Sequence, residues 1–209
     1  MAPRASSIGV CAQCGHRATK AAMVAHLEAC VVTHDNGAPS RPLVALRFDA
    51  VGEPRYWLVL EARADAKLRQ IDAVLRQVWL ECCGHMSAFR VGRRQLAMSA
   101  APAVAFAPMG TRVDYEYDFG STTALTGELV GNRHGSIGAR PVRLLARNEP
   151  LVWPCAECPA PATTVCPYCY DGGAGLFCDA HAAAHEHASE EIYLPVVNSP
   201  RMGVCGYAG

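Results

Sequence analysis

The sequence of 209 residues lacks several features that would assign it to a common class of protein. It carries no formal net charge, because 19 Lys and Arg residues balance 19 Asp and Glu residues. Its first ten residues, MAPRASSIGV, contain no apolar run of the kind found in a signal peptide. The longest mostly apolar stretch, residues 96–109, contains two prolines and is too short to span a bilayer. We therefore expect a cytoplasmic protein with no membrane segment.

Most of the chain has only a small excess of positive over negative charge. Basic residues outnumber acidic ones by 3 to 2 in residues 1–40 and by 14 to 10 in residues 41–145. Residues 146–209 hold 2 basic and 7 acidic residues. Tight, non-specific binding to nucleic acid requires a strongly basic face, so this distribution disfavours it. Enzyme motifs are missing too: the chain has no phosphate-binding glycine loop, no HExxH and no Ser-His-Asp order.

What the sequence does have is cysteine, with eleven residues arranged mostly in C-x-x-C pairs. In a reducing compartment such pairs indicate metal binding rather than disulfides. The pairs lie near the two ends, and the turn-rich segment HDNGAPSRP follows the first of them. We predict a zinc finger in residues 1–36, an α+β domain in 41–147, a two-zinc module in 150–190 and an ordered tail in 191–209.

The middle region predicts an antiparallel sheet with a packed helix. The runs PLVALRFDA and RYWLVLEA are typical of two strands joined by a turn. Asp65 can cap a helix that continues to Leu80 and carries a one-sided apolar stripe. The run RVDYEYDFG alternates between an aromatic face that ends at Phe119 and an acidic face. Because helix and antiparallel strands occur together, the predicted fold class is α+β.

Two groups of side chains in this region could bind a cation or react. The acidic face of residues 114–118 could bind a hard cation or a basic partner, although a solvated strand face is the simpler interpretation. Cys82, Cys83 and His85 could form a further metal site or a reactive thiol pair. We favour buried thiols, because adjacent cysteines direct their side chains differently.

The N-terminal cysteines have the spacing of a zinc finger: C-x2-C, eleven residues, then H-x3-C. The histidine and the last cysteine are four residues apart, so they project from the same side of a helix and can complete a tetrahedral site. The predicted ligands are Cys11, Cys14, His26 and Cys30. The stretch CAQCG…MVAHLEAC resembles the ubiquitin-binding zinc fingers of DNA-repair proteins, with Glu28 at the acidic helix position. That resemblance implies the fold of the finger, and both a closed finger without a partner and a finger that docks a protein are consistent with it.

The C-terminal region contains eight potential ligands, enough for two zinc ions. They are Cys155, Cys158, Cys166, Cys169, Cys178, His181, His185 and His187. A sequential partition assigns the first four to one ion. An interleaved partition pairs Cys155 and Cys158 with Cys178 and His181, and the seven-residue gap, short for a zinc ribbon, favours it. The region resembles the B-box family, whose ligands are interleaved in that order.

Twelve ligands at four per ion predict about three zinc ions, all structural. Closed sites rich in thiolate hold small domains together, whereas a catalytic zinc keeps one position for water. If His187 did not bind, its site would have three protein ligands and a water. A zinc-dependent hydrolase is the corresponding alternative.

The middle region resembles the plasmid pRiA4b open-reading-frame-three-like family. The matching residues are Trp57, Trp79, His85, Phe89, Tyr115, Tyr117, Asp118, Phe119 and Gly120. The resemblance implies the fold but no activity.

Taken together, these patterns predict a zinc-stabilised adaptor that binds another macromolecule, most simply a protein. A nucleic-acid-binding protein linked to a mobile element is the second hypothesis, supported by Arg90, Arg93 and Arg94. We also expect the tail to pack on the middle region, with Cys205 as a small buried residue rather than a ligand.

Overall fold

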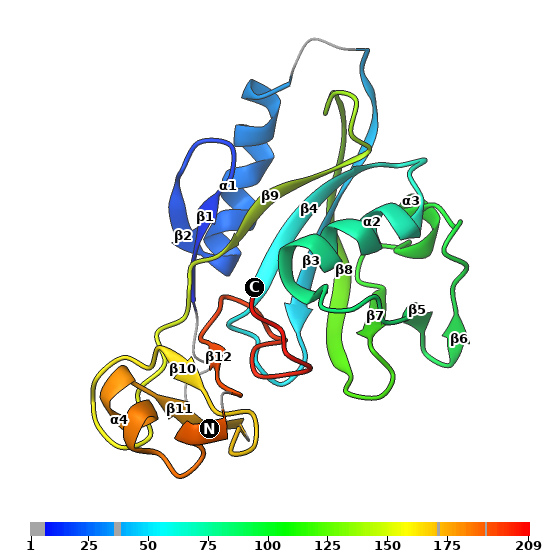
Figure 1. The fold of residues 1–209 in the computed structure, drawn as a ribbon. Helices are drawn as coiled ribbons and strands as arrows, with labels where there is room; N and C mark the ends of the chain where they lie inside the picture. The colour runs from blue at the N-terminus through cyan, green and yellow to red at the C-terminus, as the bar shows by residue number, and fades with distance from the viewer. Residues whose placement is uncertain (1–6, 36–38, 171, 191) are drawn as a thin grey trace.

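One antiparallel sheet of nine strands runs through most of the molecule (Figure 1). The structure, a computed structural model, describes residues 7–35, 39–170, 172–190 and 192–209. The strand order is β2-β1-β9-β4-β3-β8-β7-β5-β6. The strands are β1 (Ile8–Cys11), β2 (Arg17–Thr19), β3 (Arg41–Ala50), β4 (Trp57–Arg63), β5 (Ser87–Val91), β6 (Arg94–Gln95), β7 (Arg112–Tyr117), β8 (Thr123–Gly135) and β9 (Val142–Asn148).

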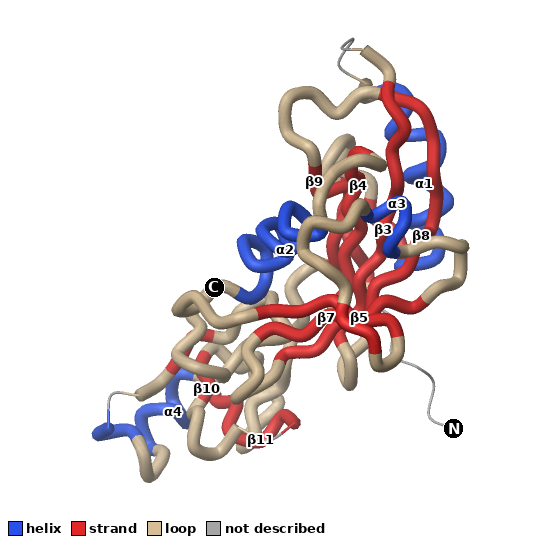
Figure 2. The backbone as a smooth tube through the Cα atoms, turned by 90° about the vertical axis from the view of Figure 1, so that its right-hand side faces the viewer, coloured by secondary structure: helices blue, strands red, loops and turns tan. Residues whose placement is uncertain are grey.

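The chain has few helices, and α1 and α2 cover opposite faces of the large sheet. In Figure 2 helices α1 and α2 lie on opposite sides of the central strands. The helices are α1 (Lys20–Thr33), α2 (Leu68–Leu75), the π-helix η1 (Arg76–Leu80), α3 (Pro102–Ala105), α4 (Asp179–Ala184) and the 3-10 helix η2 (Ala188–Glu190). The predicted antiparallel sheet is confirmed, but the protein is richer in sheet than a balanced α+β fold. In the described part of the chain, no helix combines the length and the apolar character needed to cross a membrane.

Strand β4 shows how two cores form on one sheet. Its alternate residues Leu58 and Leu60 belong to the larger core, together with the apolar stripe of α2 and η1. Trp57 and Val59 point the other way and join the smaller core under α1. Because both faces are covered, the strand is buried along nearly its whole length, which explains its almost continuous apolar sequence.

The helix predicted from Asp65 to Leu80 begins later than expected. Asp65 does not cap it and instead forms an ion pair with Arg63 (3.1 Å). Helix α2 starts at Leu68, where the side-chain oxygen of Gln70 accepts the backbone N–H of Lys67 (2.8 Å). This bond satisfies one of the donors that a helix N-terminus leaves unpaired.

The alternation of the acidic strand also ends earlier than predicted. Tyr115 and Tyr117 are fully buried, as the pattern requires, and β7 ends there. Asp118 takes a left-handed backbone (φ 63°) and turns inward, where it forms an ion pair with Arg201 of the tail (2.7 Å). Phe119 is exposed instead of lying on the aromatic face. The long-range pair with Arg201 accounts for the difference.

A small C-terminal module lies beyond one end of the large sheet (Figure 1). Its sheet has the order β11-β10-β12 and carries α4 beside it. The strands are β10 (Thr164–Val165), β11 (Gly172–Phe177) and β12 (Leu194–Pro195). After β12 the tail returns to the body of the protein, where Ser199 donates a hydrogen bond to the carbonyl of Trp79 in η1 (2.6 Å). The tail therefore connects the module to the body of the protein.

Candidate metal centres

All eleven cysteines and five of the eight histidines gather into four clusters, within which the potential ligand atoms lie no more than 4.8 Å apart. None of the cysteines forms a disulfide. We call the groups the N-terminal cluster (Cys11, Cys14, His26, Cys30), the first C-terminal cluster (Cys155, Cys158, Cys178, His181), the second C-terminal cluster (Cys166, Cys169, His185, His187) and the junction cluster (Cys82, Cys83, His85, Cys205). All four are compatible with metal binding.

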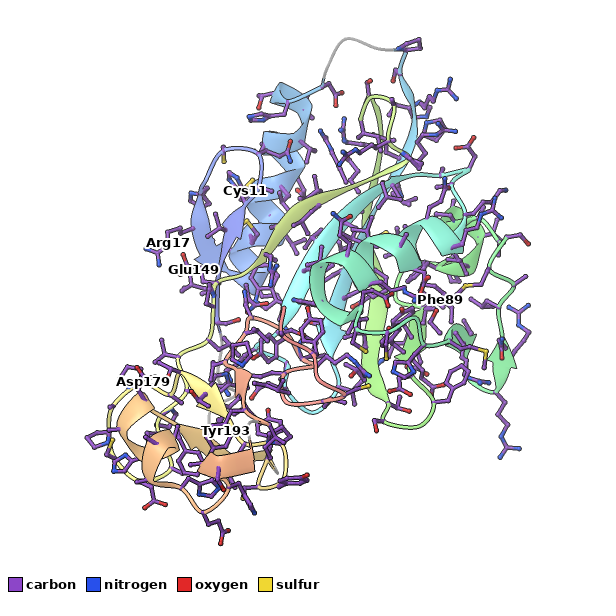
Figure 3. All side chains as sticks on the ribbon, viewed as in Figure 1. Cys11, Arg17, Phe89, Glu149, Asp179 and Tyr193 are labelled. Carbon is purple, nitrogen blue, oxygen red and sulfur yellow. The ribbon has the colours of Figure 1, made fainter. Side chains whose placement is uncertain are left out.

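The N-terminal cluster lies between the β1–β2 hairpin and α1, where Figure 3 labels Cys11. Cys11 ends β1, and the backbone then makes a tight knuckle in which the N–H of Gly15 donates to the carbonyl of Cys11 (2.9 Å). Gly15 has a left-handed backbone (φ 76°), which a residue with a side chain adopts less readily. His26 and Cys30 stand one turn apart on α1, so the predicted four residues do converge.

The thiols of this cluster differ in how readily they ionise. A hydrogen bond from the backbone N–H of His16 lowers the pKa of Cys14. Burial raises the pKa of Cys30 to about 12. Without a metal, Cys30 would therefore stay a neutral thiol at pH 7. A bound divalent cation displaces that proton, so metal affinity at this cluster should increase with pH.

The first C-terminal cluster uses a knuckle and the start of α4. Cys155 and Cys158 come from the knuckle, while Cys178 immediately precedes α4 and His181 lies in its first turn. Burial opposes ionisation of Cys155, but hydrogen bonds from the backbone N–H groups of Cys178 and Glu157 lower its pKa to about 6. The Cys155 thiol is therefore a thiolate at neutral pH, the form that binds metal.

The second C-terminal cluster contains the remaining ligands of the module. Cys169 Sγ lies 3.4 Å from His185 Nε2 and 3.5 Å from His187 Nδ1. Cys166 Sγ lies 3.4 Å from the same nitrogen of His187. Of the two partitions that the spacing allows, the structure therefore has the interleaved one. His187 takes part, so this cluster has four donors rather than three.

Distances inside the three terminal clusters resemble the edges of a zinc tetrahedron. Bonds of about 2.3 Å to sulfur and about 2.0–2.1 Å to nitrogen would place two sulfurs about 3.8 Å apart, and a sulfur and a nitrogen about 3.6 Å apart. The Sγ atoms of Cys11 and Cys30 are 3.8 Å apart, and those of Cys158 and Cys178 are 3.9 Å apart. Sulfur–nitrogen contacts span 3.3–3.5 Å. Four donors complete such a tetrahedron, and a water ligand would need a fifth position.

The junction cluster contradicts two of our expectations. Cys205 is exposed rather than buried, and it lies 3.7 Å from Cys83 Sγ and 3.3 Å from His85 Nε2. Cys83 is also exposed and Cys82 is only partly buried, so these cysteines are not the buried thiols we favoured. The sequence carried one signal of this site: after the terminal clusters are assigned, three cysteines remain, and His85 is next to two of them.

The acidic residues of β7 do not form a cation site. Glu116 pairs with Arg90 on the neighbouring strand (3.2 Å), and Asp118 has turned inward to Arg201. Asp114 is left on the strand as an exposed carboxylate. Separated in this way, the three carboxylates cannot share one ion.

A groove of about 310 Å³ opens between α1 and the sheet. Its walls are mainly apolar, from Val24, Leu27 and Val31 on α1 and from Leu43, Val130 and Leu145 on the strands. We call this feature the α1 groove. It lies on the same helix that carries two ligands of the N-terminal cluster, so the cluster and the groove share one structural element.

Charged residues lie along one side of the α1 groove. Glu61, only 2% exposed, forms ion pairs with Arg133 (2.7 Å) and Arg143 (2.6 Å). Arg133 also pairs with Asp35, just after α1 (2.8 Å). Glu28 lines the groove from α1 and is exposed. Glu61 is neutralised by its neighbours, so Glu28 gives the groove its net negative charge.

No protein-family model matches the chain, and no curated protein matches it significantly. Among solved structures, the chain is similar to the crystal structure of a protein of unknown function, MM3350, from Methanosarcina mazei Go1. The two chains are 14% identical, the match covers 51% of this chain and 69% of that one, and the TM-score is 0.44. At this identity and TM-score the likeness establishes neither a shared fold nor a shared function.

Proposed function

We propose that this chain is a zinc-stabilised binding protein that holds an extended segment of another protein in the α1 groove. The observation that carries the proposal is the groove itself, a largely apolar hollow of about 310 Å³ beside an exposed carboxylate. Ligand sites in proteins are typically concave and apolar, with a few polar groups that fix orientation. The resemblance of the N-terminal finger to ubiquitin-binding fingers supports a protein as the ligand.

Zinc is the metal that best suits the three terminal clusters. Two of them offer three thiols and one imidazole, and the second C-terminal cluster offers two of each. Such soft sulfur and nitrogen donors in tetrahedral sets select zinc over the hard cations. Free thiols in these numbers require a reducing compartment, so we place the protein in the cytoplasm.

The N-terminal ion would keep the groove open and correctly shaped. His26 and Cys30 anchor α1 to the end of β1, which pairs with β9 of the large sheet. Val24, Leu27 and Val31 of the same helix form one wall of the groove. A helix fixed in this way leaves less conformational entropy to be lost when the ligand binds.

Charge complementarity defines the ligand further. Arg133 already has two carboxylate partners, whereas no ion pair involves Glu28 among the described residues. A lysine or arginine of the ligand would pair with Glu28 while a neighbouring apolar side chain enters the groove. We therefore propose a segment in which a basic residue is close to a large apolar residue.

A peptide selection tests this proposal. Linear peptides would be selected from a random phage-displayed library on the immobilised, zinc-loaded protein, and their affinities measured by fluorescence polarisation. Val130→Trp fills the groove and should weaken the selected peptides at least tenfold. Val32→Trp makes the same change on α1 at a site outside the groove that is 60% exposed, and it should leave affinity within twofold of wild type.

The charge of the selected peptides gives a second readout. Glu28→Gln should weaken peptides that contain a lysine or arginine by about threefold, in line with an exposed ion pair. Ubiquitin serves as a folded probe in the same assay. Equal affinities of the two tryptophan variants, or a failure to enrich any peptide, would remove the groove as the binding site.

Nucleic-acid binding is the second candidate, and one observation favours it. The β5–β6 hairpin exposes Arg93 and Arg94 at its tip, while Arg90 is occupied by Glu116. If this hairpin binds a phosphate backbone, a 30-base-pair duplex should shift in a gel at low salt, and Arg93→Gln with Arg94→Gln should abolish the shift. No shift at low salt would eliminate this candidate.

A further inference from the structure

We propose that the junction cluster binds a fourth zinc ion, which clasps the C-terminal tail to the body of the protein. The site is formed by two distant parts of the chain. Cys82, Cys83 and His85 lie between η1 and β5, and Cys205 comes from the tail. The proposal does not depend on what the α1 groove binds.

Geometry is the first argument. Cys83 Sγ lies 3.7 Å from both Cys82 Sγ and Cys205 Sγ, which matches the sulfur–sulfur edge of about 3.8 Å in a zinc tetrahedron. His85 Nε2 lies 3.3 Å from Cys205 Sγ and 3.0 Å from Cys83 Sγ. The second of these must lengthen by about half an ångström to reach the ideal edge of about 3.6 Å. Disulfides are not formed, because their sulfurs would lie about 2.05 Å apart.

The backbone explains how adjacent cysteines can face one ion. Between them and His85, Gly84 adopts a left-handed backbone (φ 81°) that reverses the chain. The carboxylate of Glu81 holds this turn by accepting the N–H of Gly84 (2.6 Å) and the hydroxyl of Tyr117 (3.2 Å). The loop is therefore pinned to the end of η1 and to β7. Such support from neighbouring groups is typical of ordered metal sites.

Cys205 provides an independent observation from the other side of the site. Its backbone is left-handed (φ 52°), a strained conformation that residues with a side chain seldom adopt. Gly203 and Gly206 on either side are left-handed too (φ 78° and 68°). This turn directs the Cys205 thiol toward the loop of Cys83. A metal bond at Cys205 would offset the strain.

The charge around the cluster also suits an anionic metal complex. Three thiolates with one zinc ion carry a net charge of −1, because −3 and +2 combine. The guanidinium of Arg201 interacts with Cys82 and is fully buried. Its Nε has no hydrogen-bond partner among the described residues. Asp118 shares this cation and lies 3.5 Å from His85 Nε2. A buried arginine beside the thiolates would stabilise the complex.

The count of cysteines agrees with a fourth site. With the junction cluster included, every one of the eleven cysteines belongs to a four-donor group. Its three thiols and one imidazole repeat the donor set of the N-terminal and first C-terminal clusters. Because Cys83 and Cys205 are exposed, we expect this ion to be the first of the four that a chelator removes.

Elemental analysis of the full chain, purified under reducing conditions with zinc, tests the proposal. Wild type should contain four zinc ions, and Cys205→Ser should contain three. Ala208→Ser makes a similarly small change at a nearby exposed position and should keep four. A wild-type content of three ions, or equal contents in the two serine variants, would overturn the fourth site.

Two further measurements separate loss of the ion from loss of the fold. Cys83→Ser should also bind three ions, and the circular dichroism of both cysteine variants should match that of wild type. With cobalt in place of zinc, each variant should lose about one quarter of the d–d absorbance. Limited proteolysis should cleave the tail of both variants faster than that of Ala208→Ser. A Cys83–Cys205 disulfide in the reduced, zinc-loaded protein would contradict the proposal.

Discussion

The two ends of the molecule both carry cysteine knuckles, but they are supported in different ways. The N-terminal finger shares its core with the large sheet: Met23 and Leu27 of α1 pack with Trp57 and Leu145. In the C-terminal module, by contrast, the core beside α4 consists largely of the ligands themselves, with Cys155 and Cys166 buried next to Phe177. The N-terminal cluster reinforces an existing core. In the C-terminal module the ligands form one core themselves, beside a second, small apolar core of Ala162, Val165, Leu176 and Met202.

Contacts outside the cores also attach the N-terminal finger more firmly to the large sheet. Gly9 of β1 lies so close to Trp57 that an added Cβ would come within 2.4 Å of the indole ring. Arg17 on β2 pairs with Glu149, directly after β9 (2.6 Å) (Figure 3). The finger is thus a continuation of the sheet. A segment as short as the C-terminal module has little apolar surface of its own, so we expect its fold to depend on metal.

The largest predicted effect comes from removing one metal at each end. Structural zinc contributes about 10–16 kcal/mol of apparent binding energy, as much as the whole stability of a small domain. Cys166→Ser should therefore unfold residues 150–190 while the large sheet stays intact. Cys30→Ser should release its ion yet leave α1 partly docked through Met23 and Leu27. Hydrogen exchange followed by mass spectrometry would measure the loss of protection in residues 150–190 and in α1.

The large sheet serves as the internal control for the variants Cys166→Ser and Cys30→Ser. Peptides from β3, β4 and β8 should exchange at the wild-type rate in both variants. If α1 and the C-terminal module lost protection to the same extent, the distinction between a reinforced core and a metal-dependent one would be wrong.

The next prediction concerns the buried carboxylate of Glu61, which links β4 to Arg133 on β8 and Arg143 on β9. Glu61→Gln leaves Arg143 without its carboxylate and Arg133 with Asp35 alone, and breaking a buried pair in this way costs up to about 3–5 kcal/mol. Glu128→Gln removes a carboxylate that pairs with Arg47 at a more exposed position and should cost about 0–1 kcal/mol. Urea unfolding of the two variants gives the difference, and equal losses would refute a structural role for Glu61.

Local spacing was sufficient to identify the ligands of the terminal clusters, because each set lies within a short stretch of sequence. It favoured but did not settle the interleaved partition of the eight C-terminal ligands, which the structure has. The same local reasoning identified β3 and β4, and the buried stripe of α2. It could not reveal that β1 pairs with β9, since Gly9 and Asn148 are far apart in sequence and their pairing depends on the whole sheet.

Cys82, Cys83 and His85 were recognised from the sequence as a possible metal site, but the fourth member of the junction cluster, Cys205, was missed for the same physical reason. Cys205 and Cys83 are separated by 122 positions, and no short-range pattern connects them. Their approach depends on the tail, which is held by Arg201 and Ser199 through contacts with Asp118 and Trp79. The same contact of Arg201 turned Asp118 off the strand face. Tertiary interactions of this kind override a periodicity that is otherwise well defined.

The smallest predicted effect is the pH dependence of the ion pair between Asp35, just after α1, and Arg133 on β8. The Arg133 guanidinium, hydrogen-bonded to Asp35 at 2.8 and 3.0 Å, holds the pKa of that carboxyl below its usual value. A lowered pKa in the folded state adds stability above the unfolded pKa of about 4, and that stability is lost as the pH falls through the folded value. Asp35→Asn should therefore cost about 0.5 kcal/mol at pH 7 and nothing once the carboxyl of the wild type is protonated.

The experiment compares urea unfolding of wild type and Asp35→Asn between pH 7 and pH 3. The difference between the two proteins is the relevant quantity, because acid also releases metal from both. Asp65→Asn is the matched control: Asp65 pairs with Arg63 but is 66% exposed, so screening by water should leave its effect smaller at every pH. A difference that stayed constant down to pH 3 would mean that Asp35 acts through its shape rather than its charge. The link between the end of α1 and the sheet would then rest on the apolar contacts of α1.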